Sequence, residues 1–519
     1  MNNMKKYNLI PRKIDLTLNR VRLLVLSLTV TLLFTSCEKW FDVTPTSEMR
    51  GSQHFDNVLG FRQSLTGCYI AMAHEKAYGK NLTWFATELM GHQVQNKINP
   101  LSSALSAHAY DKNEVIPVVE EIWSQLANVI ANANDGLYNL EQKQKDLSPI
   151  DYAVLRGEFL AVRAYVHFDL LRLYGYGNYG KRSTELDAKK TVPYITRVHK
   201  DMASQVTGAE FYAALIKDIK EAEELLKPND PVSAEKDLSY ISEVNAEGFY
   251  KFRDLHLNYF AVKALEARVH LWFGTPDAMD KALEAAKEVI AFVEKGKGYK
   301  EPKLQTEIKL LELREINDKN YSMTQEALFA LQVQDLGSKT SQYYVPSFVG
   351  THGSALTIPE SRIKELYTDL SSKDVRMTKL LIRNQNTSPI SYISMKYDQS
   401  SLSNTNKGRV NLIRIPEVYY IAAEASLYKG DTSESIEFLN KVLAKRGNKA
   451  LGNELDKEKI LEEIKKEYEK EFVAEGVLFF QYKRWGTGKL PLSKEAETMT
   501  SKEYVLPFPE IEKKSGYVQ

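Results

Sequence analysis

Two stretches of the sequence show helical periodicity on both sides of a very short break. Gly274 and Gly430 each stand at the break, where a glycine can end a helix. Small residues such as Ala285 recur on the second helix and allow close approach of its partner. Helix pairs of this kind cannot bury their apolar faces alone, so the chain is expected to stack them side by side. The two pairs are expected at 256–274 with 276–294 and at 414–429 with 432–446.

The pairs resemble tetratricopeptide units, and the remaining pattern extends them. In 211–226, apolar residues form one stripe while the charges take the other face. Two weaker pairs, 116–141 with 151–174 and 211–226 with a neighbour, are candidates to complete the stack. The predicted fold class is mainly α, with tetratricopeptide-type helix pairs as an α-solenoid scaffold, long irregular loops and a few short strands. Other helices are expected at 57–73, 360–370 and 457–475, and strands at 327–333, 380–382 and 391–397.

The N-terminus has the pattern that is typical of an export signal. Basic residues precede an uncharged apolar run at 23–34, which is shorter than the roughly 20 residues needed to span a bilayer. The run ends in small residues followed by Cys37, which resembles the lipobox of bacterial lipoproteins, where the thiol is acylated. We expect a signal peptide at 1–36 and a single unit at 37–519, with an N-terminal part to about 300 and a C-terminal part from about 301.

Charge and cysteine content restrict the partners. Residues 1–36 hold six Lys/Arg and one Asp, so their removal changes the formal net charge from +1 to about −4. This balance argues against nucleic acid as a partner. Cys68 is the only other cysteine besides Cys37, so no disulfide can form within the mature chain.

Patterns typical of catalysis are missing from the sequence. It contains no His-Glu-x-x-His, Gly-x-Ser-x-Gly, phosphate-binding glycine loop or EF-hand spacing. The nine histidines are scattered, which disfavours a metal site. A pair of distant carboxylates could still act as a glycosidase, but we expect no enzyme activity, no cofactor and no metal. Glu223 and Glu224 are expected at solvated helix positions.

Six stretches in one order resemble the SusD/RagB family of outer-membrane nutrient-binding lipoproteins. The hallmark is the helix at 158–175, EFLAVRAYVHFDLLRLYG. The others are the lipobox with 40–45 (WFDVTP), Ile122-Trp123 followed by 128–134, 191–194 (TVPY), 467–476 running into 480–486 (FQYKRWG), and 506–511 (LPFPEI). Gln481 and Leu478 depart from residues common in the family, at positions that concern helix packing.

The resemblance implies a binding protein that does no chemistry. Family members place tetratricopeptide helix pairs under an irregular ligand-binding part and lie as a lid over a TonB-dependent, SusC-like β-barrel transporter. Their ligand is mostly an oligosaccharide and for some members a peptide. The implied location is the outer membrane, with a lipid anchor and exposure at the cell surface.

The long loops are the place to look for the ligand site. Sugar binders supply aromatic planes with amides or charged groups at the rim. By resemblance, the family's stacking aromatics come from the loop before the first Trp-containing helix and from the region after the strand at 326–329. The candidate ligand residues are Tyr78, Asn81, Trp84, Gln95, Asn96, His108 and Tyr110 in the first segment, and Tyr343 and Tyr344, with Phe348 near them, in the second.

Several of these residues also admit a purely structural interpretation. Trp84 and Phe85 could instead anchor their loop to the core. Trp123, Trp272 and Trp485 are expected in the core. Arg163, in an apolar helix, is expected to pair with a buried acceptor, since an unpaired buried charge is costly. A peptide binder of the same architecture and a tetratricopeptide scaffold for protein partners remain as alternative functions.

Overall fold

The computed structural model describes residues 54–198, 203–233, 248–295, 308–317, 320–344, 355–368, 373–384, 389–403, 406–493 and 497–516. The chain from Asn57 on forms one compact unit. The predicted signal peptide and Cys37, like Phe348, lie outside the described residues.

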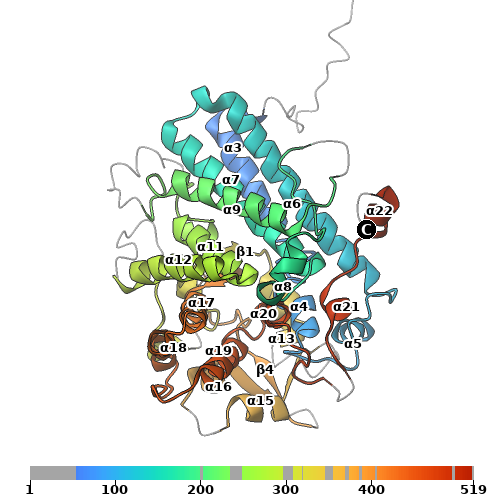
Figure 1. The fold of residues 1–519 in the computed structure, drawn as a ribbon, viewed down its shortest axis with the longest axis vertical. Coiled ribbons are helices and arrows are strands. Elements are labelled where there is room, and N and C mark those ends of the chain that lie inside the picture. The colour runs from blue at the N-terminus through green and yellow to red at the C-terminus, as the bar shows by residue number, and fades with distance from the viewer. Residues whose placement is uncertain are drawn as a thin grey trace, which may run out of the picture. The chain divides into compact units, whose positions relative to one another are not determined.

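A stack of long helices runs through this unit, each helix packing on the next one along the chain (Figure 1). The prediction of a mainly α fold built from helix pairs is confirmed. The helices of the stack are α3 (Val58–Met72), α6 (Ile116–Lys143), α7 (Pro149–Tyr174), α9 (Gly208–Leu226), α11 (Tyr259–Phe273), α12 (Pro276–Glu294), α17 (Ile415–Tyr428), α18 (Thr432–Lys445) and α19 (Lys457–Glu471).

The break between α11 and α12 shows why the pairs form. Gly274 ends α11 with φ +61°, in the left-handed region that glycine adopts at low cost. The next residue, Thr275, caps α12 through its side chain, which accepts from the Ala278 amide. Ala285 of α12 is buried where that helix packs against α11 and α17. Gly430 has φ +90° just after α17, so the first helix of the predicted second pair also ends where a glycine was expected to end it.

Two small antiparallel sheets lie beside the stack. One pairs β1 with β5, and the other has the order β2-β4-β3. Strands β1, β3 and β4 lie in or overlap the segments predicted at 327–333, 380–382 and 391–397, although β4 ends at Ser394. The two-residue β2 was missed, and so was β5. Its partner lies far away in the sequence, so no local turn signals the pairing. The strands are β1 (Ala327–Gln332), β2 (Ile358–Pro359), β3 (Leu381–Asn384), β4 (Ser391–Ser394) and β5 (Arg409–Arg414).

Most of the short helices occupy parts of the chain that the sequence left as loops, whereas α15 lies within the helix predicted at 360–370. Among the intervals without repeat periodicity in the sequence are 78–115 and 334–359, which hold the candidate ligand residues. Helices α4 and α5 lie within the first and α13 within the second, so these intervals are less irregular than expected. Helices of one or two turns carry too little periodicity to detect from sequence. The short helices are α4 (Ala86–Met90), α5 (Pro100–Ser106), α8 (Tyr179–Leu186), α13 (Leu336–Tyr344), α15 (Glu360–Leu366), α16 (Val375–Lys379), α20 (Leu478–Trp485), α21 (Ser501–Tyr504) and α22 (Glu510–Ser515).

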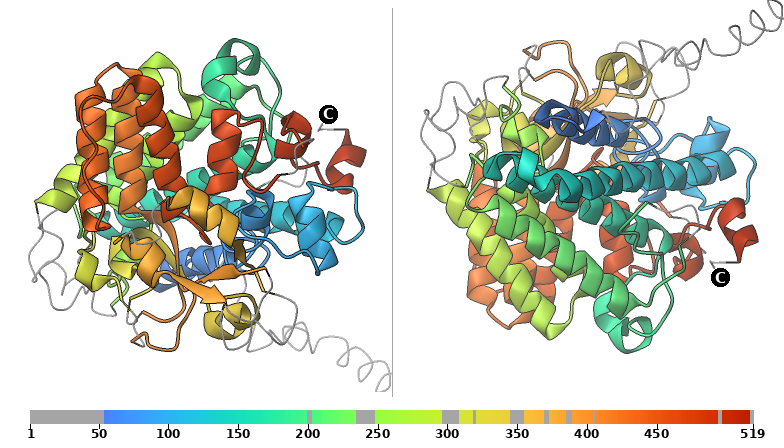
Figure 2. Two further views of the ribbon diagram at one scale, coloured as in Figure 1. Left: turned by 90° about the horizontal axis from the view of Figure 1, so that it is seen from below. Right: turned by 90° about the horizontal axis from the view of Figure 1, so that it is seen from above.

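Several of the family-like motifs meet at the C-terminal end of α7. The ammonium of Lys483 in α20 donates to the carbonyl oxygens of Arg172 (2.7 Å) and Leu173 (3.1 Å). The Leu506 amide donates to the same Leu173 carbonyl at 3.1 Å. Phe508 lies 5.3 Å from the Trp123 ring on α6. Carbonyls at a helix end lack partners within the helix, so these contacts join the C-terminal segments to the stack. Figure 2 shows the long α6 and α7 side by side and the C-terminal helices near their ends.

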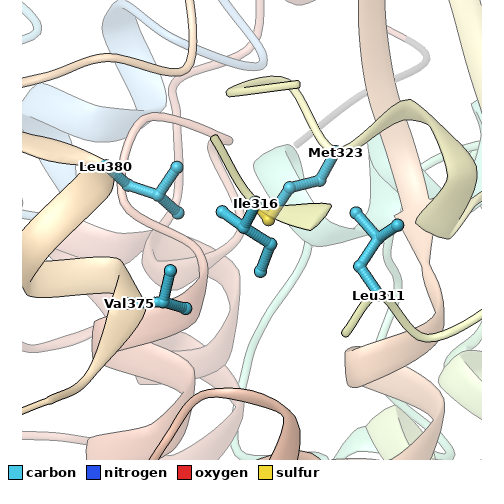
Figure 3. Packing of buried hydrophobic residues seen from close by; sticks show 5 residues of the cluster. All are labelled: Leu311, Ile316, Met323, Val375 and Leu380. Atoms are coloured by element: carbon cyan, nitrogen blue, oxygen red, sulfur yellow. The ribbon is translucent and has the colours of Figure 1, made fainter. Parts of the chain in front are cut away.

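A small apolar cluster packs the chain between the stack and the strands. Figure 3 shows its members facing one another, and each is at most 2% exposed. Burial of this kind stabilises residues 308–317 and 320–326 against α16, although these residues form only two single-turn 3₁₀ helices. The cluster consists of Leu311, Ile316, Met323, Val375 and Leu380.

Many buried charges in the described residues form ion pairs. Arg163 donates two hydrogen bonds of 2.7 Å to the Asp218 carboxylate, so its predicted acceptor exists. The expectation for Glu223 was wrong: it is 8% exposed and lies beside Lys263, because α9 packs its charged edge against α11. Glu224 is exposed as expected. Trp123 and Trp272 are buried as predicted, and Trp485 is half-buried.

Candidate functional site

The aromatic residues of the first predicted segment are mostly core residues. Trp84 is 0% exposed, and its indole N–H donates to the Gly79 carbonyl at 2.9 Å. Tyr78 is also buried, and its hydroxyl donates to Asp169 of α7 at 2.7 Å. Neither ring presents a face to a ligand in this structure. Trp84 therefore anchors its loop to the core in this structure. Phe85, which is 3% exposed, does the same.

The second predicted segment lies against the first. The Tyr343 ring on α13 is 5.4 Å from that of Trp84 and 5.5 Å from that of Phe85, between centroids. The Tyr344 hydroxyl donates to the Trp84 carbonyl at 2.6 Å, and its ring is buried. Tyr343 alone of these four rings is half-exposed. The fold thus joins two segments some 260 residues apart and leaves one of the four rings half-exposed.

A cavity of about 450 Å³ opens beside this aromatic cluster. The ammonium of Lys80 lies at its edge, 4.5 Å from the Phe85 centroid and 5.5 Å from that of Tyr343. The volume of the cavity falls within the range of small-ligand sites. We call it the Lys80 cavity; its lining residues are His74, Glu75, Lys76, Lys80, Asn81, Phe85, Leu101, Val118, Glu121 and Lys339.

Gln95 and Asn96 shape the backbone rather than this cavity. Gln95 exchanges two backbone hydrogen bonds with Thr357, of 2.8 and 3.1 Å. The Asn96 side-chain oxygen accepts from the amides of Ile98 and Asn99, both at 3.0 Å, and so closes the turn before α5. Contact of Gln95 or Asn96 with a ligand therefore stays a prediction.

His108 and Tyr110 lie at a second, larger cavity of about 980 Å³. It is lined by residues 107–111, the start of α6 and the C-terminal segment from 501 to 513. The Tyr110 hydroxyl donates to the Glu503 carbonyl at 2.6 Å. Burial lowers the pKa of His108 to about 4, with the neighbouring His92 adding to that effect, so its ring is neutral at pH 7. The residues predicted as one site therefore lie in two places.

Of the ten residues that line the Lys80 cavity, sequence reasoning proposed only Asn81 as a ligand residue and missed every lysine and glutamate. Lys80 and Lys339 show no pattern in the sequence, since isolated lysines are common on any surface. Their role follows only from the approach of α13 to the loop after α3, which the sequence does not encode locally. A search for charged residues close in sequence to the aromatic candidates could have found Lys80.

The described part of the chain holds no group of three or more His, Cys, Asp or Glu residues that could bind a metal ion. Within the same residues, no helix has both the length and the apolar character needed to cross a membrane.

Comparison with protein families gives two matches that together cover most of the chain. Residues 39–247 match a SusD-like family described as "Starch-binding associating with outer membrane". Residues 355–515 match the SusD/RagB family, described as "SusD family". A comparison with curated proteins gives no match.

Solved structures share the fold along nearly the whole chain. A SusD superfamily protein from Bacteroides thetaiotaomicron is 22% identical with a TM-score of 0.67, and the match covers 89% of this chain and 99% of that one. A SusD-like carbohydrate binding protein from Bacteroides vulgatus is 18% identical with a TM-score of 0.65, covering 88% and 96%. The fold and the two family matches agree with the order of motifs in the sequence. The chain belongs to the SusD/RagB family.

Proposed function

We propose that the protein binds an oligosaccharide at the Lys80 cavity and delivers it to a TonB-dependent, SusC-like transporter in the outer membrane. The observation that carries this proposal is a cavity rimmed by amide and charged groups and lined by Phe85, with the half-exposed Tyr343 ring packed against Phe85. Sugar rings have apolar C–H faces edged by hydroxyls, which such a site complements. The family description, starch binding with outer-membrane association, and the similar carbohydrate-binding protein support it.

The protein acts by binding, and no reaction is proposed. Release of reducing ends from a bound glycan would contradict this part of the proposal. A peptide ligand remains the alternative, because the same cavity could accept peptide side chains. The scaffold alternative is weaker, since α12 is covered by both α11 and α17 and leaves less of its surface for a partner.

Replacement of Tyr343 by alanine should weaken glycan binding about 5- to 30-fold, because stacking and burial of one aromatic face contribute about 1 to 2 kcal/mol. Calorimetry with a panel of oligosaccharides and peptides measures this effect. Tyr138→Ala is the matched control, since Tyr138 lies on α6 and is 60% exposed. Unchanged glycan affinity in Tyr343→Ala would exclude the Tyr343 face as the sugar platform. Binding of peptides alone would replace the glycan by a peptide ligand.

Cys37 is the proposed anchor, held by lipid to the outer membrane and exposed at the cell surface. Replacement of Cys37 by serine should move the protein from the membrane to the soluble fraction, because two or three acyl chains supply the anchoring and each buried CH₂ group contributes about 0.8 kcal/mol. Cell fractionation and metabolic labelling with a fatty acid measure this. Glycan affinity should stay the same. Retention of the serine variant in the membrane would contradict the lipid anchor.

A further inference from the structure

The ammonium of Lys80 is a partly buried cation among aromatic rings. Besides Phe85 and Tyr343, its Nζ lies 6.0 Å from the Trp84 centroid. Ring faces attract a cation but carry no formal charge. Burial lowers the pKa of Lys80, and the charge of Glu75 partly offsets that effect. The surroundings therefore desolvate this ammonium without neutralising it.

The other charges around the cavity are already paired with one another. Lys76 lies 3.2 Å from Glu121, and Lys339 lies 3.2 Å from Glu75, between nitrogen and oxygen. Among the described residues, no carboxylate oxygen lies within the 4.0 Å of an ion pair from Lys80 Nζ. The lining thus holds three lysines against two glutamates, and the cation in excess, Lys80, lies beside the half-exposed Tyr343 ring.

This positive charge is local. The formal charge of residues 37–519 is about −4, so the protein as a whole does not attract anions. A neutral sugar offers Lys80 only hydroxyl oxygens, whereas a carboxylate or sulfate would form a charge-assisted hydrogen bond and neutralise the buried cation. The difference in affinity between an acidic and a neutral glycan should appear as selectivity, because the cavity can discriminate between two glycans of similar size and shape.

We propose that the Lys80 cavity selects an acidic glycan, whose carboxylate or sulfate pairs with Lys80 Nζ while a sugar face lies on Tyr343. This inference rests on the proposed glycan-binding function and specifies its ligand class. The carboxylate of a uronic acid and the sulfate of a sulfated sugar share the chemistry that the site recognises.

Matched glycans distinguish charge from shape. The probes are oligogalacturonate with its methyl ester, and carrageenan oligosaccharides with their desulfated, neutral form. Calorimetry uses the detergent-solubilised full chain at low and physiological salt. We expect the acidic member of at least one pair to bind tenfold or more tighter than its neutral partner. The preference should shrink with added salt.

Variants then assign the preference to Lys80. Lys80→Gln should abolish it while changing affinity for the neutral member less than threefold, and Lys80→Arg should retain it. Lys217→Gln is the matched control, because Lys217 is exposed on α9 and lies outside the cavity lining, and it should change the preference less than threefold. Thermal unfolding of each variant verifies that it folds. If Lys80→Gln does not fold, the Lys80→Arg variant and the salt dependence still test whether a cation at this position causes the preference for the acidic glycan.

Equal binding of both members of every pair, or an intact preference in Lys80→Gln, would overturn the acidic selectivity and leave glycan binding standing. If neither these probes nor neutral starch, xylan or mannan oligosaccharides bind, then the proposed function itself fails along with the inference.

Discussion

Replacement of Glu471 by alanine should lower the free energy of unfolding by about 3 to 5 kcal/mol. Glu471 ends α19 and is 1% exposed. Its carboxylate accepts from Arg414 at 2.8 Å, from Arg446 at 3.0 Å and from Arg376 at 3.2 Å. Each of these arginines is at most 1% exposed. Removal of the shared acceptor leaves three buried guanidinium groups with fewer anionic partners in a region that water does not reach.

Urea denaturation followed by circular dichroism measures this loss. Glu462→Ala is the matched control, because Glu462 is exposed on the same helix, and it should change stability by less than about 0.5 kcal/mol. A similar midpoint for the two variants would show that the arginines find other acceptors.

The same carboxylate predicts a pH dependence. Burial alone would raise the pKa of Glu471, but Arg446, Arg414 and Arg376 outweigh it and hold the pKa well below its ordinary value. A depressed pKa stabilises the fold above the unfolded-state pKa of about 4.3, and this stabilisation is lost as the pH falls below that value. The wild-type protein should therefore lose stability below about pH 4.5 more steeply than Glu471→Gln. Parallel pH profiles would contradict this assignment.

Replacement of Trp84 by alanine should also destabilise the protein by about 3 to 5 kcal/mol, because it leaves a cavity beneath the ligand-site candidates. The ring is fully buried, and it packs 6.1 Å from Tyr397 as well as against Tyr343 and Tyr344. Thermal unfolding measures the effect. Trp84→Phe retains part of the volume and should cost less.

Comparison of Trp84→Ala with Tyr343→Ala distinguishes a residue that supports the site from one that contacts the ligand. Tyr343→Ala should weaken ligand binding with a small loss of stability, whereas Trp84→Ala should act mainly through stability. A Trp84→Ala protein with wild-type stability and no ligand binding would restore Trp84 as a direct contact.

The sequence predicted the two segments of the candidate site but not their chemistry. Tyr343 and Trp84 stood out because aromatic residues are conspicuous in segments without helical periodicity. Sequence cannot tell an exposed ring from a buried one at such positions, since exposure depends on what packs over it. Trp84 is covered by α13, and Tyr343 lies at the edge of the same contact. His108 and Tyr110 were grouped with them only because they are near in the chain.

The sequence alone determined the stack of helices. Amphipathic periodicity, Gly274 and Gly430 at helix ends, and the ordered motifs depend on interactions within a few turns, so α11, α12, α17 and α18 lie where the pattern predicts. The tertiary structure alone decided the rest. The strand β5, the Glu471 arginine cluster and the position of Lys80 beside Tyr343 depend on residues far apart in the chain, and no local pattern records them. Such contacts form only when the packed stack brings distant segments together, and the candidate ligand site is built from contacts of that kind.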